Sequence, residues 1–358
     1  MLYPTFRPLL FKFDPETAHE LAFAGLDIAT ALGIAQRFAL YVAPSPVKLM
    51  GLSFPNRVGL AAGLDKNALH IDGLATLGFG FIECGTVTPR PQRGNPKPRI
   101  FRVPESEALI NRLGFNNHGV DQFLANVIRS RFGRPGPDAG ILGLNIGKNF
   151  DTPNNLAAND YLTCLRAVYP YASYVTVNIS SPNTEGLREL QEGAALESLL
   201  ATLKAEQTKL AQRHRKYTPL VVKIAPDLTT AEIRRIAALL MQYKIDGVIA
   251  TNTTVDHGAI AGQAHAEEDG GLSGRPLRRK ATAVIRILAS ALRGSLPIIG
   301  VGGIMSGADA AEKIAAGASL VQIYTGLIYK GPELVAEIAE ALAPKPPAPA
   351  TRDIPSQE

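Results

Sequence analysis

The sequence predicts an α/β fold, a (β/α)8 TIM barrel with a helical extension at its N-terminus. Eight short apolar runs follow one another from about residue 56, and amphipathic stretches separate the later ones. Strand–helix units in this order are typical of a parallel sheet. The chain has 358 residues, whereas such a barrel commonly needs roughly 250, so about 100 remain for extensions. Eight units over this length favour a closed barrel over an open sheet.

The eight apolar runs are predicted to be strands because β-branched and other apolar residues pack well in a pleated sheet. They are Val58–Ala61, Phe81–Gly85, Ile141–Ile146, Tyr174–Ile179, Leu220–Ala225, Gly247–Thr251, Ile298–Val301 and Leu320–Tyr324. Helices are predicted at Leu196–Arg213, Thr229–Tyr243, Pro276–Leu292 and Ala308–Ala316. Thr86–Asp138 is long for a connection between strands, so we expect an inserted excursion there, with a helix at Val120–Ile128.

Two helices are predicted before the barrel. Asp14 has the character of an N-cap and Pro15 that of a first helical residue, and Leu21, Leu26 and Leu32 follow at helical spacing. A second short helix is predicted over Ile34–Tyr41. A helical pair on a bilayer surface and a hairpin packed on its own domain both fit this pattern, and the periodicity alone favours the hairpin. The tail after Ala343 is rich in proline and is predicted to be disordered.

Composition excludes several classes of function. Lys and Arg outnumber Asp and Glu by 37 to 32, an excess too small and too dispersed for a nucleic-acid-binding protein. Cys84 and Cys164 stand far apart with no CxxC or Cys/His cluster, which argues against a bound metal and suits a reducing cytosol. No stretch reaches the ~18 apolar residues of a membrane span.

Polar and glycine residues follow the predicted strands at their carboxyl ends. The clearest case is Val175–Thr184, where a β-branched strand breaks into serines, asparagines and Pro182. A barrel brings all its carboxyl strand ends to one face, where such enzymes place their chemistry. The corresponding segments are Ala61–Lys66, Gly85–Thr86, Asn145, Asn178–Asn183, Lys223, Thr251–Thr253, Gly302–Gly303 and Tyr324–Gly326.

The last two strand ends predict a phosphate site. Barrels often bind phosphate between their seventh and eighth loops through glycine amides. The run Gly300–Gly303 lacks the third glycine of a dinucleotide fingerprint, which favours a mononucleotide cofactor over NAD. A further glycine loop, Gly270–Pro276, is expected before a helix.

The chain resembles the class 2 dihydroorotate dehydrogenases, the quinone-linked flavoenzymes of pyrimidine (UMP) biosynthesis. The resemblance covers nearly the whole chain and rests on motifs in a specific order. These motifs are Ala62–Lys66, Glu83–Pro89, Asn111–Asn117, Val177–Thr184, Gly271–Leu277 and Gly302–Ile304. It implies a (β/α)8 barrel, one FMN per chain, and oxidation of (S)-dihydroorotate to orotate.

The resemblance also implies a role for each matching residue. Ser181 matches the catalytic base that removes the C5 proton while C6 gives hydride to the flavin. Class 1 relatives generally have cysteine there and lack the extension. Substrate contacts are implied for Lys66, Asn111, Arg112, Leu113, Gly114, Phe115, Asn178, Asn183, Asn252 and Thr253. FMN contacts are implied for Ala62, Gly63, Leu64, Asp65, Lys66, Thr86, Asn145, Asn178, Lys223, Thr251, Gly274, Gly303, Tyr324 and Thr325.

The same resemblance implies a function for residues 1–44. In class 2 members this extension meets the membrane and admits quinone, and His19 and Arg102 match polar residues of the quinone tunnel. The implied organisation is an extension over 1–44, an FMN-binding catalytic barrel over 45–343 and a tail over 344–358. The implied protein is a monomer, peripheral to the cytoplasmic side of the cell inner membrane.

Two other functions fit parts of the pattern. Lys223 at a strand end would suit the nucleophile of a Schiff-base aldolase, although the glycine loops favour a larger phosphorylated cofactor. A membrane-docked protein that binds a phosphorylated ligand without catalysis is the third reading.

Overall fold

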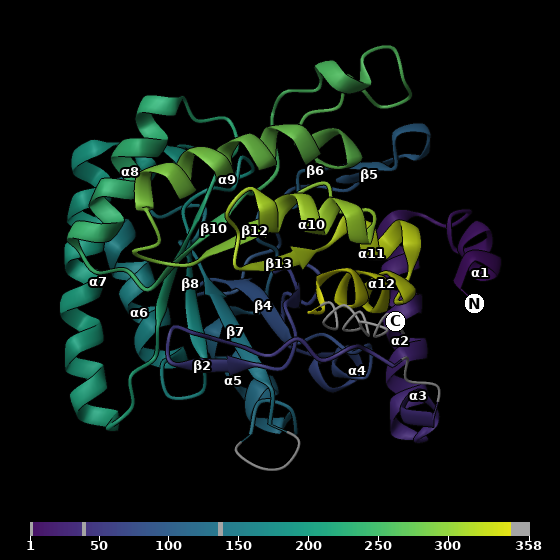
Figure 1. Ribbon diagram of the computed structural model, residues 1–358, viewed down its shortest axis with the longest axis horizontal. Coiled ribbons are helices and arrows are strands. Elements are labelled where there is room, and N and C mark those ends of the chain that lie inside the picture. The colour runs from purple at the N-terminus through teal and green to yellow at the C-terminus, as the bar shows by residue number, and fades with distance from the viewer. Residues whose placement is uncertain (1–2, 38–40, 135–138, 345–358) are drawn as a thin grey trace, which may run out of the picture.

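The computed structural model describes residues 3–37, 41–134 and 139–344. Its centre is a closed barrel of eight parallel strands wrapped by helices (Figure 1), which confirms the predicted fold class. Every predicted strand is present to within two residues at each end. Around the barrel the strands are β10 (Gly247–Ala250), β12 (Ile298–Val301), β13 (Leu320–Ile323), β3 (Val58–Leu60), β4 (Phe81–Val87), β7 (Ile141–Ile146), β8 (Tyr174–Asn178) and β9 (Leu220–Ile224).

Helices follow the strands and cover the outside of the barrel (Figure 1). The predicted helices are confirmed, and α8 begins with a complete capping box in which Thr229 and Glu232 bond each other's backbone amides. The helices are α4 (Ile71–Ala75), α5 (Gly119–Arg129), α6 (Ala157–Val168), α7 (Gly193–His214), α8 (Thr230–Gln242), α9 (Arg278–Leu292), α10 (Gly307–Ala315), α11 (Thr325–Lys330) and α12 (Glu333–Leu342).

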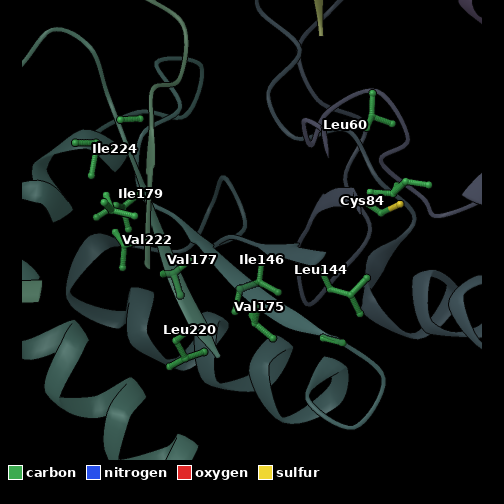
Figure 2. Packing of buried hydrophobic residues seen from close by; sticks show 14 of the residues in the cluster. Leu60, Cys84, Leu144, Ile146, Val175, Val177, Ile179, Leu220, Val222 and Ile224 are labelled. Carbon is green, nitrogen blue, oxygen red and sulfur yellow. The ribbon is translucent and has the colours of Figure 1, made fainter. Parts of the chain in front are cut away.

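Alternation along each strand separates two cores. Val175 and Val177 of β8 join Leu220 and Val222 of β9 in a large cluster that also contains buried residues of the surrounding helices (Figure 2). The residues between them face the barrel axis, because successive side chains of a strand point to opposite faces. The axis therefore receives Thr176, Val221 and Lys223. Val221 packs there with Phe81, Ile249 and Ile299 in the second, apolar core, and Thr176 and Lys223 add polar groups to the interior.

A short hairpin closes the amino-terminal end of the barrel. β1 (Val47–Leu49) and β2 (Leu52–Phe54) pair antiparallel, and Phe54 meets Phe81 edge-on at 5.3 Å between ring centres. Phe54 is completely buried, so the hairpin covers the amino-terminal end of the barrel with apolar side chains.

The long excursion contributes two of the three strands of a separate small sheet. β5 (Ile100–Val103) and β6 (Ala108–Asn111) pair antiparallel, and β11 (Gly271–Gly274) joins the other edge of β6. The prediction of a glycine loop at Gly270–Pro276 is therefore wrong over most of its length. The segment is a strand because it pairs with β6, a partner far away in the sequence. The expected helix after it, α9, is present.

The N-terminal extension packs on one side of the barrel (Figure 1). It comprises α1 (Tyr3–Leu10), α2 (Pro15–Ala31) and α3 (Ile34–Arg37), and Asp14 caps α2 by accepting from the amides of Glu16 and Thr17 at 3.0 and 3.2 Å. α1 has no counterpart among the predicted helices, and the predicted second helix is shorter than expected, with residues 38–40 outside the described part. The predicted disordered tail also lies outside it, from residue 345 onwards.

Two faces of α2 have opposite character. Ala18 and Phe23 are buried against the barrel, and His70, next to α4, hydrogen-bonds Asp27 of α2 at 2.7 Å. Leu21, Ile28 and Leu32 are 48%, 61% and 68% exposed and recur at seven- and four-residue spacing, which places them on one stripe. No helix of the described ranges is both long enough and apolar enough to cross a bilayer.

Candidate functional site

A polar cavity opens at the carboxyl ends of the barrel strands, and most of the predicted site residues line it. This confirms that the strand ends converge. The predicted residues on its wall are Ala62, Gly63, Lys66, Thr86, Asn111, Leu113, Gly114, Phe115, Asn178, Ser181, Asn183, Lys223, Thr251, Asn252, Thr253, Gly274, Gly303, Tyr324 and Thr325.

Four other predicted residues do not line the polar cavity. Asp65 is buried and accepts from the amides of Leu69 and His70 at 3.0 and 2.7 Å, so it shapes the loop after β3. Leu64 faces an apolar cavity described below. Arg112 points outward to Glu268 at 2.8 Å, and Asn145 lies within the barrel as part of a hydrogen-bond chain.

This hydrogen-bond chain crosses the floor of the cavity in one direction. The Asn252 amide donates to the Ser180 hydroxyl at 3.0 Å, and that hydroxyl donates to Asn178 Oδ1 at 3.0 Å. Asn178 Nδ2 then donates to the Thr86 hydroxyl at 2.8 Å, which donates to Asn145 Oδ1 at 2.7 Å. Each hydroxyl both accepts and donates, so every side chain in the row has its orientation set by its neighbour.

The hydrogen-bond chain ends at Glu83, which is not among the site residues predicted from the sequence. Glu83 is completely buried and accepts from Asn145 at 2.8 Å, Tyr174 at 2.9 Å and Gln322 at 2.9 Å. Three donors satisfy a buried carboxylate that would otherwise be unfavourable. A signal was available, because Glu83 and Gln322 are polar residues inside otherwise apolar predicted strands.

Lys223 extends into the cavity from β9. Its side chain is buried, and within the described ranges its ammonium makes no hydrogen bond. Burial lowers its pKa, and the negative charge of Glu83 partly opposes that shift. A buried ammonium without an acceptor fits an anionic or electron-rich ligand above it.

Lys66 supplies a second positive charge at the cavity wall. Its ammonium donates to the Gly63 carbonyl at 2.7 Å. Removal from bulk water lowers the pKa of Lys66 to about 8, against the opposing charges of Glu16 and Asp65. Lys66 therefore remains mostly protonated at pH 7 and can bind a carboxylate.

Ser181 lies on the same wall and is almost completely buried. Its hydroxyl oxygen accepts a hydrogen bond from the backbone amide of Asn183 at 3.2 Å, and in the described chain no acidic or basic side chain bonds it. Asn183 in turn donates to the carbonyl of Asn111 at 3.0 Å, which joins the serine loop to β6.

The glycine loop after β12 packs closely against the backbone at the start of α9 and leaves two of its amides without a partner among the described residues. A Cβ on Gly303 would lie 2.4 Å from the backbone nitrogen of Arg278, and its φ of +74° also favours glycine. The amides of Gly303 and Ile304 have no acceptor among the described residues. On the same cavity wall, the Thr325 hydroxyl donates to the Ser273 hydroxyl at 2.8 Å, and Ser273 is not among the residues predicted from the sequence.

A second, apolar cavity of about 660 Å³ lies between the extension and the barrel. His19 and Arg102, the residues predicted for the quinone tunnel, both line it. Arg102 donates to the Phe13 carbonyl at 2.8 Å. Burial lowers the pKa of His19 to about 3, so its imidazole is neutral near pH 7. Tyr324 lines both cavities.

Comparison with known proteins identifies the family. A model of the family "Dihydroorotate dehydrogenase" matches residues 45–345. A relative from Nitrosospira multiformis, named dihydroorotate dehydrogenase (quinone), is 60% identical over 346 residues, covering 96% of each chain. A relative of the same name from Chromobacterium violaceum is 62% identical over 343 residues, covering 96% of this chain and 98% of the relative.

A solved structure also matches. DHODH from Eimeria tenella in complex with ferulenol superposes with a TM-score of 0.82 at 39% identity, covering 92% of this chain and 90% of that one. The match extends over the barrel and most of the remaining chain. The chain therefore belongs to the dihydroorotate dehydrogenase family.

Proposed function

We propose that this chain oxidises dihydroorotate to orotate in pyrimidine biosynthesis, with FMN as its bound flavin and a membrane quinone as electron acceptor. One observation carries the proposal: a polar cavity with Ser181, Lys66 and Lys223 and an apolar cavity with His19 and Arg102 meet at Tyr324. Membership of the family favours this oxidoreductase over the aldolase and over a non-catalytic phosphate-binding protein.

The residues present fit FMN. The unpaired ammonium of Lys223 suits the electron-rich edge of the flavin ring, and Ala62 and Gly63 leave space for a flat ring system. The free amides of Gly303 and Ile304 suit its phosphate. When bound, FMN supplies a two-electron acceptor for the hydride that leaves C6 of the substrate.

Lys66 and the asparagines are proposed to bind the substrate. The ammonium of Lys66 attracts the substrate carboxylate, while Asn111, Asn183 and Asn252 offer amide donors and acceptors to the ring. Asn183 is held by Asn111 and Asn252 by its bond to Ser180, so both side chains are preorganised before substrate arrives.

Ser181 is proposed to remove the C5 proton. A free serine is a weak base, so the site must stabilise the negative charge that develops on its oxygen. The backbone amide of Asn183, which donates to that oxygen at 3.2 Å, provides part of this stabilisation. A water molecule is the carrier that we propose for the proton, because no described acidic or basic side chain reaches the hydroxyl.

The extension, residues 1–44, is proposed to sit on the membrane and to admit quinone to the apolar cavity, while 45–343 forms the catalytic barrel. The exposed stripe of Leu21, Ile28 and Leu32 supports this placement. Attachment as a peripheral monomer on the cytoplasmic side of the cell inner membrane is part of the same proposal.

The test begins with the purified protein. It should be yellow, release FMN on denaturation, and be bleached by dihydroorotate without oxygen. Quinone should then restore the colour faster than fumarate or NAD does. A protein that stays colourless and inactive after FMN is added would contradict the proposal, and preference for fumarate or NAD would contradict its choice of acceptor.

A further inference from the structure

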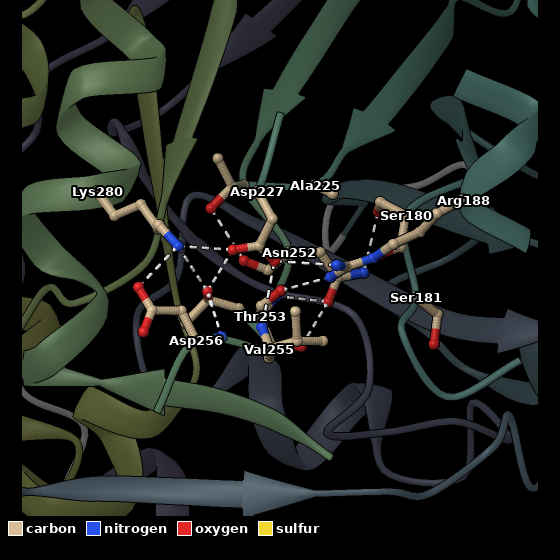
Figure 3. Close-up of polar contacts among 12 residues, drawn as sticks. Ser180, Ser181, Arg188, Ala225, Asp227, Asn252, Thr253, Val255, Asp256 and Lys280 are labelled. Carbon is tan, nitrogen blue, oxygen red and sulfur yellow. Dashed lines mark hydrogen bonds and ion pairs between the residues drawn. The ribbon is translucent and has the colours of Figure 1, made fainter. Parts of the chain in front are cut away.

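One arginine, Arg188, joins the loops that follow β8 and β10 (Figure 3). Arg188 Nε donates to the Ser180 carbonyl at 3.1 Å, and its Nη2 donates to the Thr253 carbonyl at 2.8 Å. Its Nη1 donates to Asp227 Oδ2 at 2.9 Å. A single planar guanidinium thus connects three points on three loops, because Asp227 follows β9.

The first of these contacts acts directly on the proposed base. The Ser180 carbonyl and the Ser181 amide belong to one rigid peptide plane. A hydrogen bond that fixes this carbonyl therefore fixes the plane from which the Ser181 side chain begins. Ser180 is completely buried, and no solvent competes for its carbonyl.

The second contact acts on the opposite wall. Thr253 and its neighbour Asn252 line the polar cavity, and the Asn252 side chain already bonds the Ser180 hydroxyl. The serine loop and the Asn252–Thr253 loop are thus linked twice, once by the neutral side-chain amide of Asn252 and once by the charged guanidinium of Arg188. Charge-assisted hydrogen bonds are the stronger kind.

Asp227 anchors the guanidinium. Burial opposes ionisation of Asp227, but hydrogen bonds from Lys280, Thr254, the Val255 amide and Arg188 hold its pKa below the usual value. The Lys280 contact measures 2.7 Å and the Val255 contact 3.1 Å. The carboxylate is therefore ionised at neutral pH and presents Arg188 with a fixed partner.

The backbone of Arg188 is also held in place. It belongs to the short 3-10 helix Leu187–Gln191, and its own carbonyl accepts from Gln191 Nε2 at 3.3 Å. Gln191 Oε1 accepts from the amide of Ala225, just after β9, at 2.9 Å. Both ends of the arginine side chain are thus attached to the β9 end of the barrel.

We infer that Arg188 is a positioning residue for the reaction: it sets the distance between the Ser181 loop and the substrate-binding loop after β10, and so aims the serine at the carbon that loses its proton. The inference rests on the proposed function. It predicts that loss of Arg188 slows removal of the C5 proton while the flavin stays bound, because the cofactor contacts lie on other residues.

The test measures the limiting rate of flavin reduction by dihydroorotate in stopped flow. Arg188→Ala should lower that rate about 100-fold, the size expected for a displacement of about 1 Å. Arg188→Lys should recover only part of it, because an ammonium cannot reach all three acceptors at once. Added guanidinium chloride should raise the rate of Arg188→Ala but not that of the wild type.

Two further readouts separate positioning from a general structural role. With substrate deuterated at C5, the isotope effect on flavin reduction should grow in Arg188→Ala, because removal of that proton becomes slower relative to hydride transfer. Amide hydrogen exchange should increase together in residues 180–184 and 252–255. Arg166→Ala, which removes a 2.7 Å ion pair with Glu206 on the outer helices, is the matched control and should change none of these values.

A limiting rate within threefold of wild type would overturn the inference. A slower rate with an unchanged C5 isotope effect would also overturn it. If the alanine variant does not fold, the same outcomes are read from Arg188→Lys. Failure of the proposed function would be visible in the wild type, which dihydroorotate would then not bleach, whereas failure of this inference is visible only in the variants.

Discussion

Lys66 and Lys223 place two positive charges on the wall of one cavity, and the two lysines differ in their surroundings. Lys223 lies deep in the barrel and has no acceptor in the described chain. Lys66 lies at the cavity wall, and its removal from bulk water lowers its pKa to about 8. The pKa of Lys66 lies close to physiological pH, so a change in its charge makes ligand binding depend on pH.

Orotate affinity should fall above pH 8. Lys66 is protonated below its pKa of about 8 and loses its charge above it, so attraction for the orotate carboxylate disappears as pH rises. Orotate titrations, followed by the flavin spectrum from pH 6 to 10, should show a dissociation constant that rises up to about tenfold per unit above pH 8. Lys66→Met should bind weakly with no such dependence; an identical pH profile in both proteins would refute the assignment.

Ser181→Ala should slow flavin reduction by dihydroorotate about 100- to 10,000-fold, the usual contribution of a general base. The rate falls because, among the described residues, no acidic or basic side chain bonds the Ser181 hydroxyl and could replace it as the base. Stopped-flow absorbance measures the effect, and the FMN content should match the wild type. Reoxidation by quinone should be unaffected, since the apolar cavity does not contain Ser181. Unchanged reduction would remove Ser181 from the base role.

At the scale of elements, α2 has one face on the barrel and one in solvent. The exposed stripe should bind lipid if the extension meets a membrane. The double variant Ile28→Glu/Leu32→Glu should therefore lose binding to liposomes and slow reduction of a long-chain quinone. Flavin reduction by dihydroorotate should persist. Met241→Glu on α8, on the far side of the barrel, is the control and should bind like the wild type. Full liposome binding by the double variant would place the anchor elsewhere.

The elements that the sequence predicts well are those whose pattern is local. The eight barrel strands are buried apolar runs, and α8 carries its own capping residues. β6 and β11 escape prediction because Gly271 pairs with Asn111, and neither short segment signals its partner. α1 escapes because Pro4 and Pro8 lie within it, although Tyr3 and Arg7 dock it on α11 through the carbonyls of Ile328 and Tyr329.

The same distinction applies to the site. Residues such as Ser181, Lys66 and Gly303 are predictable because they follow strands whose ends must converge in a barrel. Glu83 is not, because its role appears only when Tyr174 and Gln322 face it across the closed interior. A residue that acts by joining loops leaves no motif at all, since its acceptors are backbone carbonyls that every sequence possesses.

For the whole molecule, one buried lysine makes stability depend on pH. Lys313 is completely buried, donates to the Arg278 carbonyl at 2.8 Å and to the Thr282 hydroxyl at 2.6 Å, and burial lowers its pKa to about 7. An unfolded chain keeps this proton up to about pH 10.5. Between pH 7 and 10.5 the unfolded state therefore binds more protons, and stability rises with pH.

The urea midpoint of unfolding tests this. From pH 7 to 9 the wild type should gain stability relative to Lys313→Met, with a slope of up to about 1.4 kcal/mol per pH unit from this group. The comparison with Lys313→Met removes the contribution of other titrating groups. Parallel midpoints for the two proteins across that range would show that Lys313 keeps its proton when folded.

Tyr324 forms part of the wall of both cavities, so each cavity can hold its own ligand at the same time. An inhibitor bound among the apolar side chains around His19 leaves the polar cavity accessible. It should therefore lower the maximal velocity without competing with dihydroorotate. Orotate, in turn, should occupy only the polar cavity and compete there with dihydroorotate. Each inhibitor's steady-state pattern thus reports which cavity it occupies.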